Sequence, residues 1–122
     1  MQTILIVEDE PTLQKALSVA FQQEGYEIKS ALEGETGLAL AKELKPNLIL
    51  LDLILPKMDG FEILDELKKD ESTKDIPVII LTNLESSQDI ERALVLGAKT
   101  YLVKAQYSLE ELVEKIKKTL EE

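Results

Sequence analysis

A chain of 122 residues, 44% of them hydrophobic, has the size and composition of one globular domain (residues 1–122) with a single core. Its 14 lysines and arginines against 24 aspartates and glutamates give a net charge of -10, which argues against a nucleic-acid-binding surface. The chain has no cysteine and no histidine, so disulfides, thiolate chemistry and imidazole ligands are excluded, and any metal ion would be bound through oxygen.

The first part of the chain alternates short apolar runs with amphipathic segments. We predict a strand at residues 4–7, followed by a helix at residues 11–25 with a proline in its first turn. A strand at residues 26–31 alternates apolar and charged side chains, as a strand does that is well covered on one side only. The next helix covers residues 34–44. Its expected inner face consists of Gly37, Leu40, Ala41 and Leu44.

The third predicted strand, at residues 48–51, is an unbroken run of leucine and isoleucine. Such a run is typical of a central strand in a parallel sheet, which is buried on both faces. Asp52 follows this strand directly, and a helix at residues 59–67 comes next, with Asp59 in the position of its N-cap. The central strand therefore ends at a carboxylate.

The second half of the chain repeats the pattern of strand and helix. A strand at residues 78–81 precedes a helix at residues 86–97, and a further strand occupies residues 100–103. The last helix begins at a capping box formed by Ser108 and Glu111. The expected inner face of the helix at residues 86–97 consists of Ile90, Ala93 and Leu94.

Five strands joined by single helices predict an α/β fold, a five-stranded parallel sheet with helices on both faces. Parallel strands present their carboxyl ends at one edge of the sheet, and chemistry in open α/β sheets gathers at that edge. Each residue that follows a strand also fits an ordinary cap or turn when taken alone, so it is their common edge that favours a site. The residues expected to converge there are Glu8, Asp9, Asp52, Thr82 and Lys104.

Three carboxylates in one pocket repel one another, so they are expected to take up protons, a cation or both. Mg²⁺ is the natural occupant, because it prefers oxygen ligands and is typically held by one or two carboxylates together with phosphate oxygens. Glu8, Asp9 and Asp52 could supply the negative charge. With Lys104 opposite, the pocket could neutralise a phosphoryl group while Asp52 attacks it, which predicts an aspartyl phosphate.

At these residues the sequence resembles the receiver domain of bacterial two-component response regulators, which has a (βα)5 flavodoxin-like fold. The resemblance covers the whole chain, in the segments ILIVEDE, LILLDLILPKMDG, VIILT and GAKTYLVK. It implies that Asp52 accepts a phosphoryl group from a sensor histidine kinase or phosphotransfer protein. It also implies that Glu8, Asp9, Asp52 and the backbone carbonyl of Ile54 hold Mg²⁺.

The resemblance further implies a switch. Thr82 would move onto the phosphoryl oxygens, Lys104 would pair with them, and Tyr101 would change rotamer with Thr82. A downstream protein target or a second protomer would bind the fourth helix, fifth strand and fifth helix, which predicts a monomer or weak homodimer.

The ends and hydropathy of the chain add three expectations. The chain stops after its last helix and carries neither a signal sequence nor an apolar run long enough to span a membrane. We therefore expect a stand-alone cytoplasmic receiver that contacts neither membrane nor nucleic acid directly. It would be a phosphoacceptor that assists its own phosphotransfer and slow self-dephosphorylation, rather than an enzyme.

Two positions depart from the family pattern, and two more bear on the lifetime of the phosphoryl group. Ala105 replaces the proline that usually follows the site lysine in a cis peptide, and a cis bond before a non-proline residue costs about 2.5 to 4 kcal/mol. We therefore predict a trans peptide, or a strained cis one, and a loop that presents Lys104 less rigidly. Asn83 replaces a smaller residue and narrows the approach to the acceptor. Ile54 and Leu84 are apolar where some receivers orient the hydrolytic water, which predicts slow self-dephosphorylation.

Three other kinds of protein fit the sequence less well. A phosphorylation-independent docking module is favoured by the missing proline and opposed by the intact acidic residues. A phosphohydrolase with an aspartate nucleophile lacks its second aspartate, since Pro11 stands in that place, and the chain has no room for a cap domain. A nucleotide-binding domain lacks a glycine-rich phosphate loop after the first strand.

Overall fold

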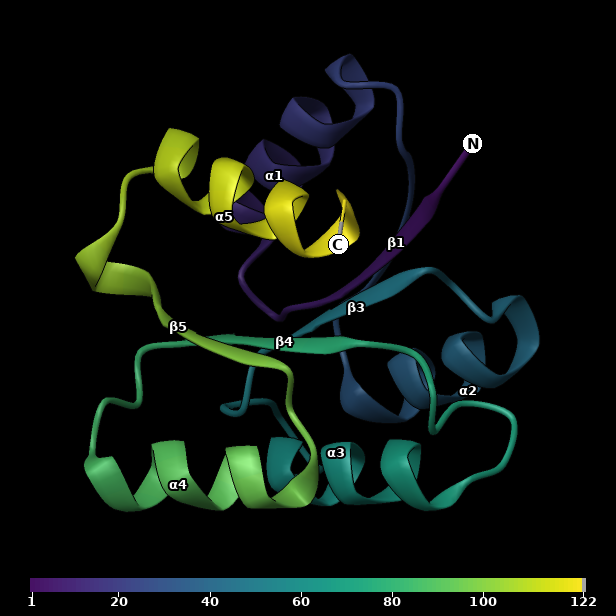
Figure 1. Cartoon of the computed structure of the whole chain (residues 1–122), viewed down its shortest axis with the longest axis vertical. Coiled ribbons are helices and arrows are strands. Elements are labelled where there is room, and N and C mark those ends of the chain that lie inside the picture. Colours follow the sequence, from purple (N-terminus) through teal and green to yellow (C-terminus); the bar gives the residue numbers. More distant parts are fainter. Residues whose placement is uncertain (122) are drawn as a thin grey trace.

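The computed structural model describes residues 1–121 and contains one five-stranded parallel sheet in the order β2-β1-β3-β4-β5 (Figure 1). The predicted fold class is confirmed. Every neighbouring pair of strands is parallel, with Val7 opposite Leu51 and Thr82 opposite Val103 at the carboxyl ends. The strands are β1 (Thr3–Val7), β2 (Glu27–Ala31), β3 (Leu48–Leu51), β4 (Val78–Thr82) and β5 (Thr100–Val103).

The helices are divided between the two faces of the sheet (Figure 1). The helices are α1 (Pro11–Gln23), α2 (Gly34–Leu44), α3 (Gly60–Lys69), α4 (Ser87–Leu96) and α5 (Leu109–Glu121). Helices α1 and α5 lie together above the sheet in this view, and α2, α3 and α4 lie below it. A short 3-10 helix, η1 (Lys104–Gln106), was not predicted. Within residues 1–121 no helix is long and apolar enough to cross a bilayer.

The core consists of two apolar clusters, one on each face of the sheet. Successive strand residues point to opposite faces, so Leu5 and Ile49 pack toward α2 and α3, whereas Ile6 and Leu50 pack toward α1 and α5. All residues of β3 and β4 are buried, as the unbroken apolar runs predict. The central strands are therefore held rigidly from both sides, up to the residues that end them.

Three helices begin with the proline or the capping side chains that the sequence predicts. Pro11 occupies the first turn of α1, and the Asp59 side chain accepts the backbone N–H of Phe61 at 2.9 Å. The capping box of α5 is reciprocal: Glu111 N–H donates to Ser108 Oγ at 3.2 Å, and Ser108 N–H donates to Glu111 Oε1 at 2.9 Å. These short-range contacts need no tertiary partner, and for that reason the sequence predicts them.

Two residues expected on inner helix faces lie outside instead. Leu44 is 38% exposed and Leu94 is 46% exposed, so the prediction that they face inward was wrong. Leu44 is the last residue of α2 and precedes its C-cap, Lys45. Helix α4 buries only Ala93, and its apolar residues Leu94 and Val95 are exposed.

Candidate functional site

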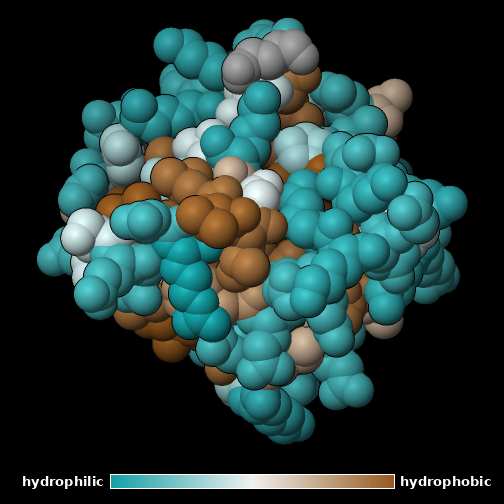
Figure 2. All heavy atoms as spheres, turned by 60° about the horizontal axis from the view of Figure 1, so that its bottom comes forward, coloured by the Kyte–Doolittle hydropathy of each residue, from teal (hydrophilic) through white to brown (hydrophobic). Residues whose placement is uncertain are grey.

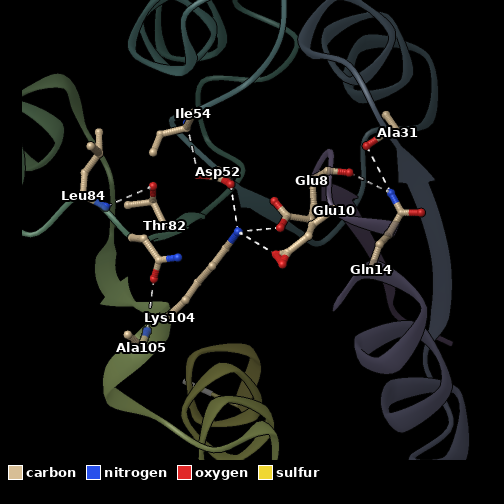
Figure 3. A network of polar contacts seen from close by, with 11 residues as sticks. Glu8, Glu10, Gln14, Ala31, Asp52, Ile54, Thr82, Leu84, Lys104 and Ala105 are labelled. Carbon is tan, nitrogen blue, oxygen red and sulfur yellow. Dashed lines mark hydrogen bonds and ion pairs between the residues drawn. The ribbon is translucent and has the colours of Figure 1, made fainter. Parts of the chain in front are cut away.

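Four of the five predicted site residues, Glu8, Asp52, Thr82 and Lys104, meet at the carboxyl edge of the sheet in Figure 3, and Asp9 lies beside Glu8 and Asp52. Glu8 and Asp52 both extend the backbone ladder by one bond past the strand ends. Glu8 N–H donates to the Ala31 carbonyl at 3.0 Å, and Asp52 N–H donates to the Val7 carbonyl at 3.1 Å. The sheet itself therefore sets where these two carboxylates leave the backbone.

Lys104 spans the gap between β5 and the two buried acids (Figure 3). Its Nζ donates to Asp52 Oδ2 at 2.8 Å and to the carboxylate of Glu8, and it lies 3.8 Å from Glu10 Oε2. The Lys104 side chain is only 12% exposed, and both carboxylates are more deeply buried. Such a low-dielectric setting strengthens the attraction between the ammonium and the two acids.

Three carboxylates face one another across the pocket. Glu8, Asp9 and Asp52 each offer one oxygen, and these oxygens lie within 4.8 Å of one another. The other oxygen of Glu8, Oε2, is buried and accepts no hydrogen bond from the described residues. A buried carboxylate oxygen without a partner is rare and costly in proteins. The donor set, three carboxylates with no nitrogen or sulfur, fits a hard divalent cation.

The pocket separates the pKa values of its two buried acids. Burial raises the pKa of Glu8 to about 8, and the neighbouring Asp52 adds to this rise while Lys104 opposes it. Burial also works to raise the pKa of Asp52, but the neighbouring Glu8, Lys104 and Thr82 side chains, of which Lys104 donates to it at 2.8 Å, bring it below its ordinary value. Near neutral pH and without a cation, the pocket therefore holds a protonated Glu8 and an ionised Asp52 beside the Lys104 ammonium.

Backbone contacts hold the loop that follows Asp52. Ile54 N–H donates to Asp52 Oδ1 at 3.1 Å, and Gly60 N–H donates to the Leu53 carbonyl at 3.1 Å. A Cβ at Gly60 would lie 2.4 Å from Leu53 Cα, so this close approach between the loop and the start of α3 requires glycine. The role expected for the Ile54 carbonyl as a metal ligand stays a prediction.

Thr82 and Tyr101 both contact Leu84, in the loop between β4 and α4. Thr82 is fully buried, and its hydroxyl oxygen accepts the backbone N–H of Leu84 at 3.5 Å. The Tyr101 hydroxyl donates to the Leu84 carbonyl at 2.7 Å. Burial raises the pKa of Tyr101 to about 12, so the phenol stays protonated and remains a donor.

The structure adds Gln14, which the sequence did not single out. Its Nε2 donates to the backbone carbonyls of Glu8 and Ala31, both at 3.2 Å (Figure 3). In the sequence Gln14 is one of several polar residues of the first helix. Only the parallel pairing of β1 and β2 brings the two carbonyls within its reach.

A second missed contact joins the two positions that depart from the family pattern. Ala105 N–H donates to Asn83 Oδ1 at 3.2 Å. No peptide bond among residues 1–121 is cis, so the predicted trans peptide between Lys104 and Ala105 is confirmed. No local pattern signals this bond, because 22 positions separate the two residues.

Comparison with known proteins agrees with this geometry. Residues 4–117 match the family model for the response regulator receiver domain. The chain is 41% identical to the DNA-binding dual master transcriptional regulator RpaA of Synechocystis sp., covering 98% of this chain and 49% of RpaA. It is 38% identical to protein PilH of Pseudomonas aeruginosa, covering 85% of this chain and 86% of PilH. The chain thus spans about half the length of RpaA but most of PilH.

Solved structures show the same similarity. A CheY-like receiver domain protein from Methanospirillum hungatei superimposes with a TM-score of 0.91 at 31% identity, covering 99% of this chain and 94% of that one. The Mn(2+)-bound form of response regulator Rcp1 superimposes with a TM-score of 0.86, also at 31% identity, covering 96% of this chain and 92% of that one.

Proposed function

This chain belongs to the response regulator receiver domain family of two-component systems, and from that premise we propose that Asp52 is its phosphoryl acceptor. The observation that carries the proposal is the pairing of the buried Asp52 with Lys104 at 2.8 Å, beside two further carboxylates. A carboxylate whose pKa is lowered stays ionised and nucleophilic, and the ammonium is ready to receive negative charge.

Glu8, Asp9 and Asp52 would hold a divalent cation, which we propose is Mg²⁺, with the Ile54 carbonyl as a further ligand. The partnerless Glu8 Oε2 supports this assignment, because a cation would satisfy it. When bound, the ion offsets the charge of the phosphoryl oxygens. The structure of Rcp1 carries Mn²⁺, a hard cation of the same charge that prefers the same oxygen ligands.

In the transfer step a carboxylate oxygen of Asp52 attacks the phosphorus of the donor. The bond between phosphorus and the donor breaks, and its electron pair leaves with the donor, an imidazole that takes up a proton in the case of phosphohistidine. Lys104 exchanges its contact with Asp52 for one with a phosphoryl oxygen, and the buried Thr82 hydroxyl donates to another. Attack by water later releases inorganic phosphate and restores the carboxylate.

The proposed output is a change in a protein-binding surface. Phosphorylation replaces the single charge of the Asp52 carboxylate by a phosphoryl group that carries about 1.5 to 2 negative charges. These charges draw Thr82 and Lys104 inward and shift the packing of Tyr101. Moving such an equilibrium from 1:99 to 99:1 takes about 5.5 kcal/mol of differential interaction. A few charge-assisted hydrogen bonds, together with relief of carboxylate repulsion, supply energies of this order.

We propose that the partners are a sensor histidine kinase or phosphotransfer protein and a downstream protein, all acting in the cytoplasm. The receiver is acidic, with a net charge of -10, so we propose that these 122 residues do not themselves contact nucleic acid. Figure 2 shows an apolar patch, ringed by hydrophilic atoms, on the side of the molecule where α3 and α4 lie. The exposed Leu94 and Val95 of α4 would add apolar contacts to a partner that binds α4, β5 and α5.

The test is the intact mass of the protein after incubation with Mg²⁺ and acetyl phosphate. We expect one added phosphoryl group, absent without Mg²⁺ and absent in Asp52→Asn. The matched control is Asp65→Asn, which removes a half-exposed carboxylate of α3 and should be modified like the wild type. A wild-type protein that binds Mg²⁺ but gains no phosphoryl group from several donors would favour the phosphorylation-independent docking module instead.

A further inference from the structure

A single hydrogen bond joins the two loops that carry Thr82 and Lys104. Asn83 directly follows Thr82, the last residue of β4, and Ala105 directly follows Lys104, the first residue after β5. The last paired residues of these strands are Thr82 and Val103. The bond of 3.2 Å from Ala105 N–H to Asn83 Oδ1 therefore continues the contact between β4 and β5 beyond the end of the sheet.

Ala105 N–H needs a partner from outside its own helix. It lies in the first turn of η1, where backbone N–H groups have no acceptor within the helix. The N-cap residue of η1, Val103, supplies no side-chain acceptor. Only the amide oxygen of Asn83 meets this donor in the described part of the chain. The bond depends on both residues, since proline at position 105 would have no N–H to donate.

We propose that Asn83 is a positioning residue for Lys104, an inference that rests on the proposed role of Lys104 in phosphoryl transfer. The nitrogen of Ala105 is attached to the carbonyl carbon of Lys104, so holding that nitrogen fixes the peptide plane from which the Lys104 side chain departs. Lys104 then reaches Asp52 and Glu8 with less loss of conformational freedom. This proposal replaces the expectation that the loop presents Lys104 loosely.

The same bond couples Lys104 to Thr82. The path runs from the Thr82 backbone through Asn83 to Ala105 and Lys104, with one hydrogen bond and otherwise covalent links. When the loop after β4 moves with the Thr82 hydroxyl, Asn83 carries the backbone beside Lys104 with it. The hydroxyl and the ammonium then approach the phosphoryl group together.

The experiment compares Asn83→Ala, Ala105→Pro and the double variant with the wild type. Two quantities are measured in every variant: the ¹⁵N NMR signal of the Lys104 ammonium and the rate of phosphorylation by acetyl phosphate with Mg²⁺. Hydrogen exchange of the Ala105 amide is measured in the proteins that keep Ala105. The matched control is Asn47→Ala. Asn47 Oδ1 accepts the Thr3 N–H at 2.8 Å, which is the same kind of bond at the opposite edge of the sheet.

We expect Asn83→Ala to speed exchange at Ala105, to broaden the Lys104 ammonium signal and to slow phosphorylation about two- to tenfold, the effect of one neutral hydrogen bond. Asn47→Ala should leave both Lys104 readouts unchanged. In the Ala105→Pro background, Asn83→Ala should cause no further loss, because the donor is already absent.

Two results would overturn the positioning role: unchanged exchange at Ala105 in Asn83→Ala, or faster exchange with unchanged Lys104 signal and phosphorylation rate. A third result separates the two proposals. If Asn83→Ala changes the Lys104 ammonium signal but the wild type itself takes up no phosphoryl group, the proposed function is overturned and the positioning of Lys104 by Asn83 stands.

Discussion

The hydroxyl of Tyr101 donates a hydrogen bond of 2.7 Å to the backbone carbonyl of Leu84, two residues after Thr82. Tyr101 belongs to β5, and Leu84 lies in the loop between β4 and α4. The aromatic side chain and the loop of the proposed switch are therefore bonded before any phosphoryl group arrives. Phosphorylation would act on an arrangement that the unmodified chain already forms.

Tyr101→Phe removes this bond while keeping the ring. We expect the free energy of unfolding to fall by about 0.5 to 1.5 kcal/mol, because the Leu84 carbonyl loses a half-buried donor. Urea unfolding followed by circular dichroism measures the difference. Tyr107→Phe is the control, since the Tyr107 ring packs under Lys115 and keeps that contact without its hydroxyl. Equal losses in the two variants would contradict a specific role for the Tyr101 bond.

Glu8 makes stability depend on pH when Mg²⁺ is absent. Its pKa is about 8 in the folded protein against an ordinary value of 4.5, so the folded state binds more protons than the unfolded state between these values. The contribution of Glu8 to stability is therefore complete below about pH 4.5 and is lost as the pH rises to about 8. The urea concentration at the midpoint of unfolding of the wild type should therefore fall as the pH is raised from 5 to 9.

Glu8→Gln is the control for that pH dependence. Glutamine does not titrate, so we expect a flatter profile and a higher midpoint than the wild type at pH 8. Mg²⁺ competes with the proton for Glu8, so the affinity of the wild type for Mg²⁺ should rise with pH up to about 8. A wild-type profile that matches Glu8→Gln would show that Glu8 is not protonated in the folded state.

Lys104→Met leaves two buried carboxylates without their cation. At pH 8 without Mg²⁺ we expect a loss of about 3 to 5 kcal/mol in the free energy of unfolding, because removing one partner of a buried ion pair leaves an uncompensated charge. The loss should shrink at pH 6, where the acids take up protons instead. Lys69→Met breaks a pair of the same length, 2.8 Å to Asp65, at the exposed surface and should change stability little. Similar losses in both variants would argue against an electrostatic cause.

Gly60→Ala tests the packing of the Asp52 loop against α3. The new Cβ would meet the Leu53 backbone at 2.4 Å, so the loop must shift, which we expect to cost about 1 to 3 kcal/mol and to slow phosphorylation. Gly25→Ala is the control, because its strain comes from a φ of 91° in an open turn far from the site. That variant should lose stability but keep the phosphorylation rate, and equal rates for the two variants would contradict the prediction.

Ile54 and Leu84 bear on the lifetime of the phosphoryl group. The Ile54 side chain is 52% exposed beside Asp52 and has no polar atom to orient a water molecule for attack. Introducing Ile54→Asn or Leu84→Gln should shorten the half-life of the phosphorylated protein, measured by intact mass after the donor is removed. Leu44→Gln, at an exposed position on α2, should leave it unchanged. The slow-hydrolysis hypothesis fails if the half-lives of Ile54→Asn and Leu84→Gln are as long as that of the wild type.

Much of the fold follows from local chemistry. The unbroken apolar run that ends at Asp52, the proline that begins α1 and the reciprocal capping box of Ser108 and Glu111 are set by near neighbours in the chain. The right-handed connection of strand to helix then brings the strand ends to one edge. The acids and the lysine could be assigned to one pocket on that basis.

The tertiary structure alone decided the contacts between loops and the exposure of helix faces. The bonds from Ala105 to Asn83, from Tyr101 to Leu84, and from Gln14 to two strand ends join residues brought together by strand order and register. The exposure of Leu94 depends on how α4 packs, since Ala93 is the one residue of this helix that the structure buries. A periodic pattern reports which side of an element is apolar, but it carries no information on what lies opposite. The sequence by itself therefore determined the architecture and which residues lie together in the pocket, whereas the packing of the chain decided the distances between them.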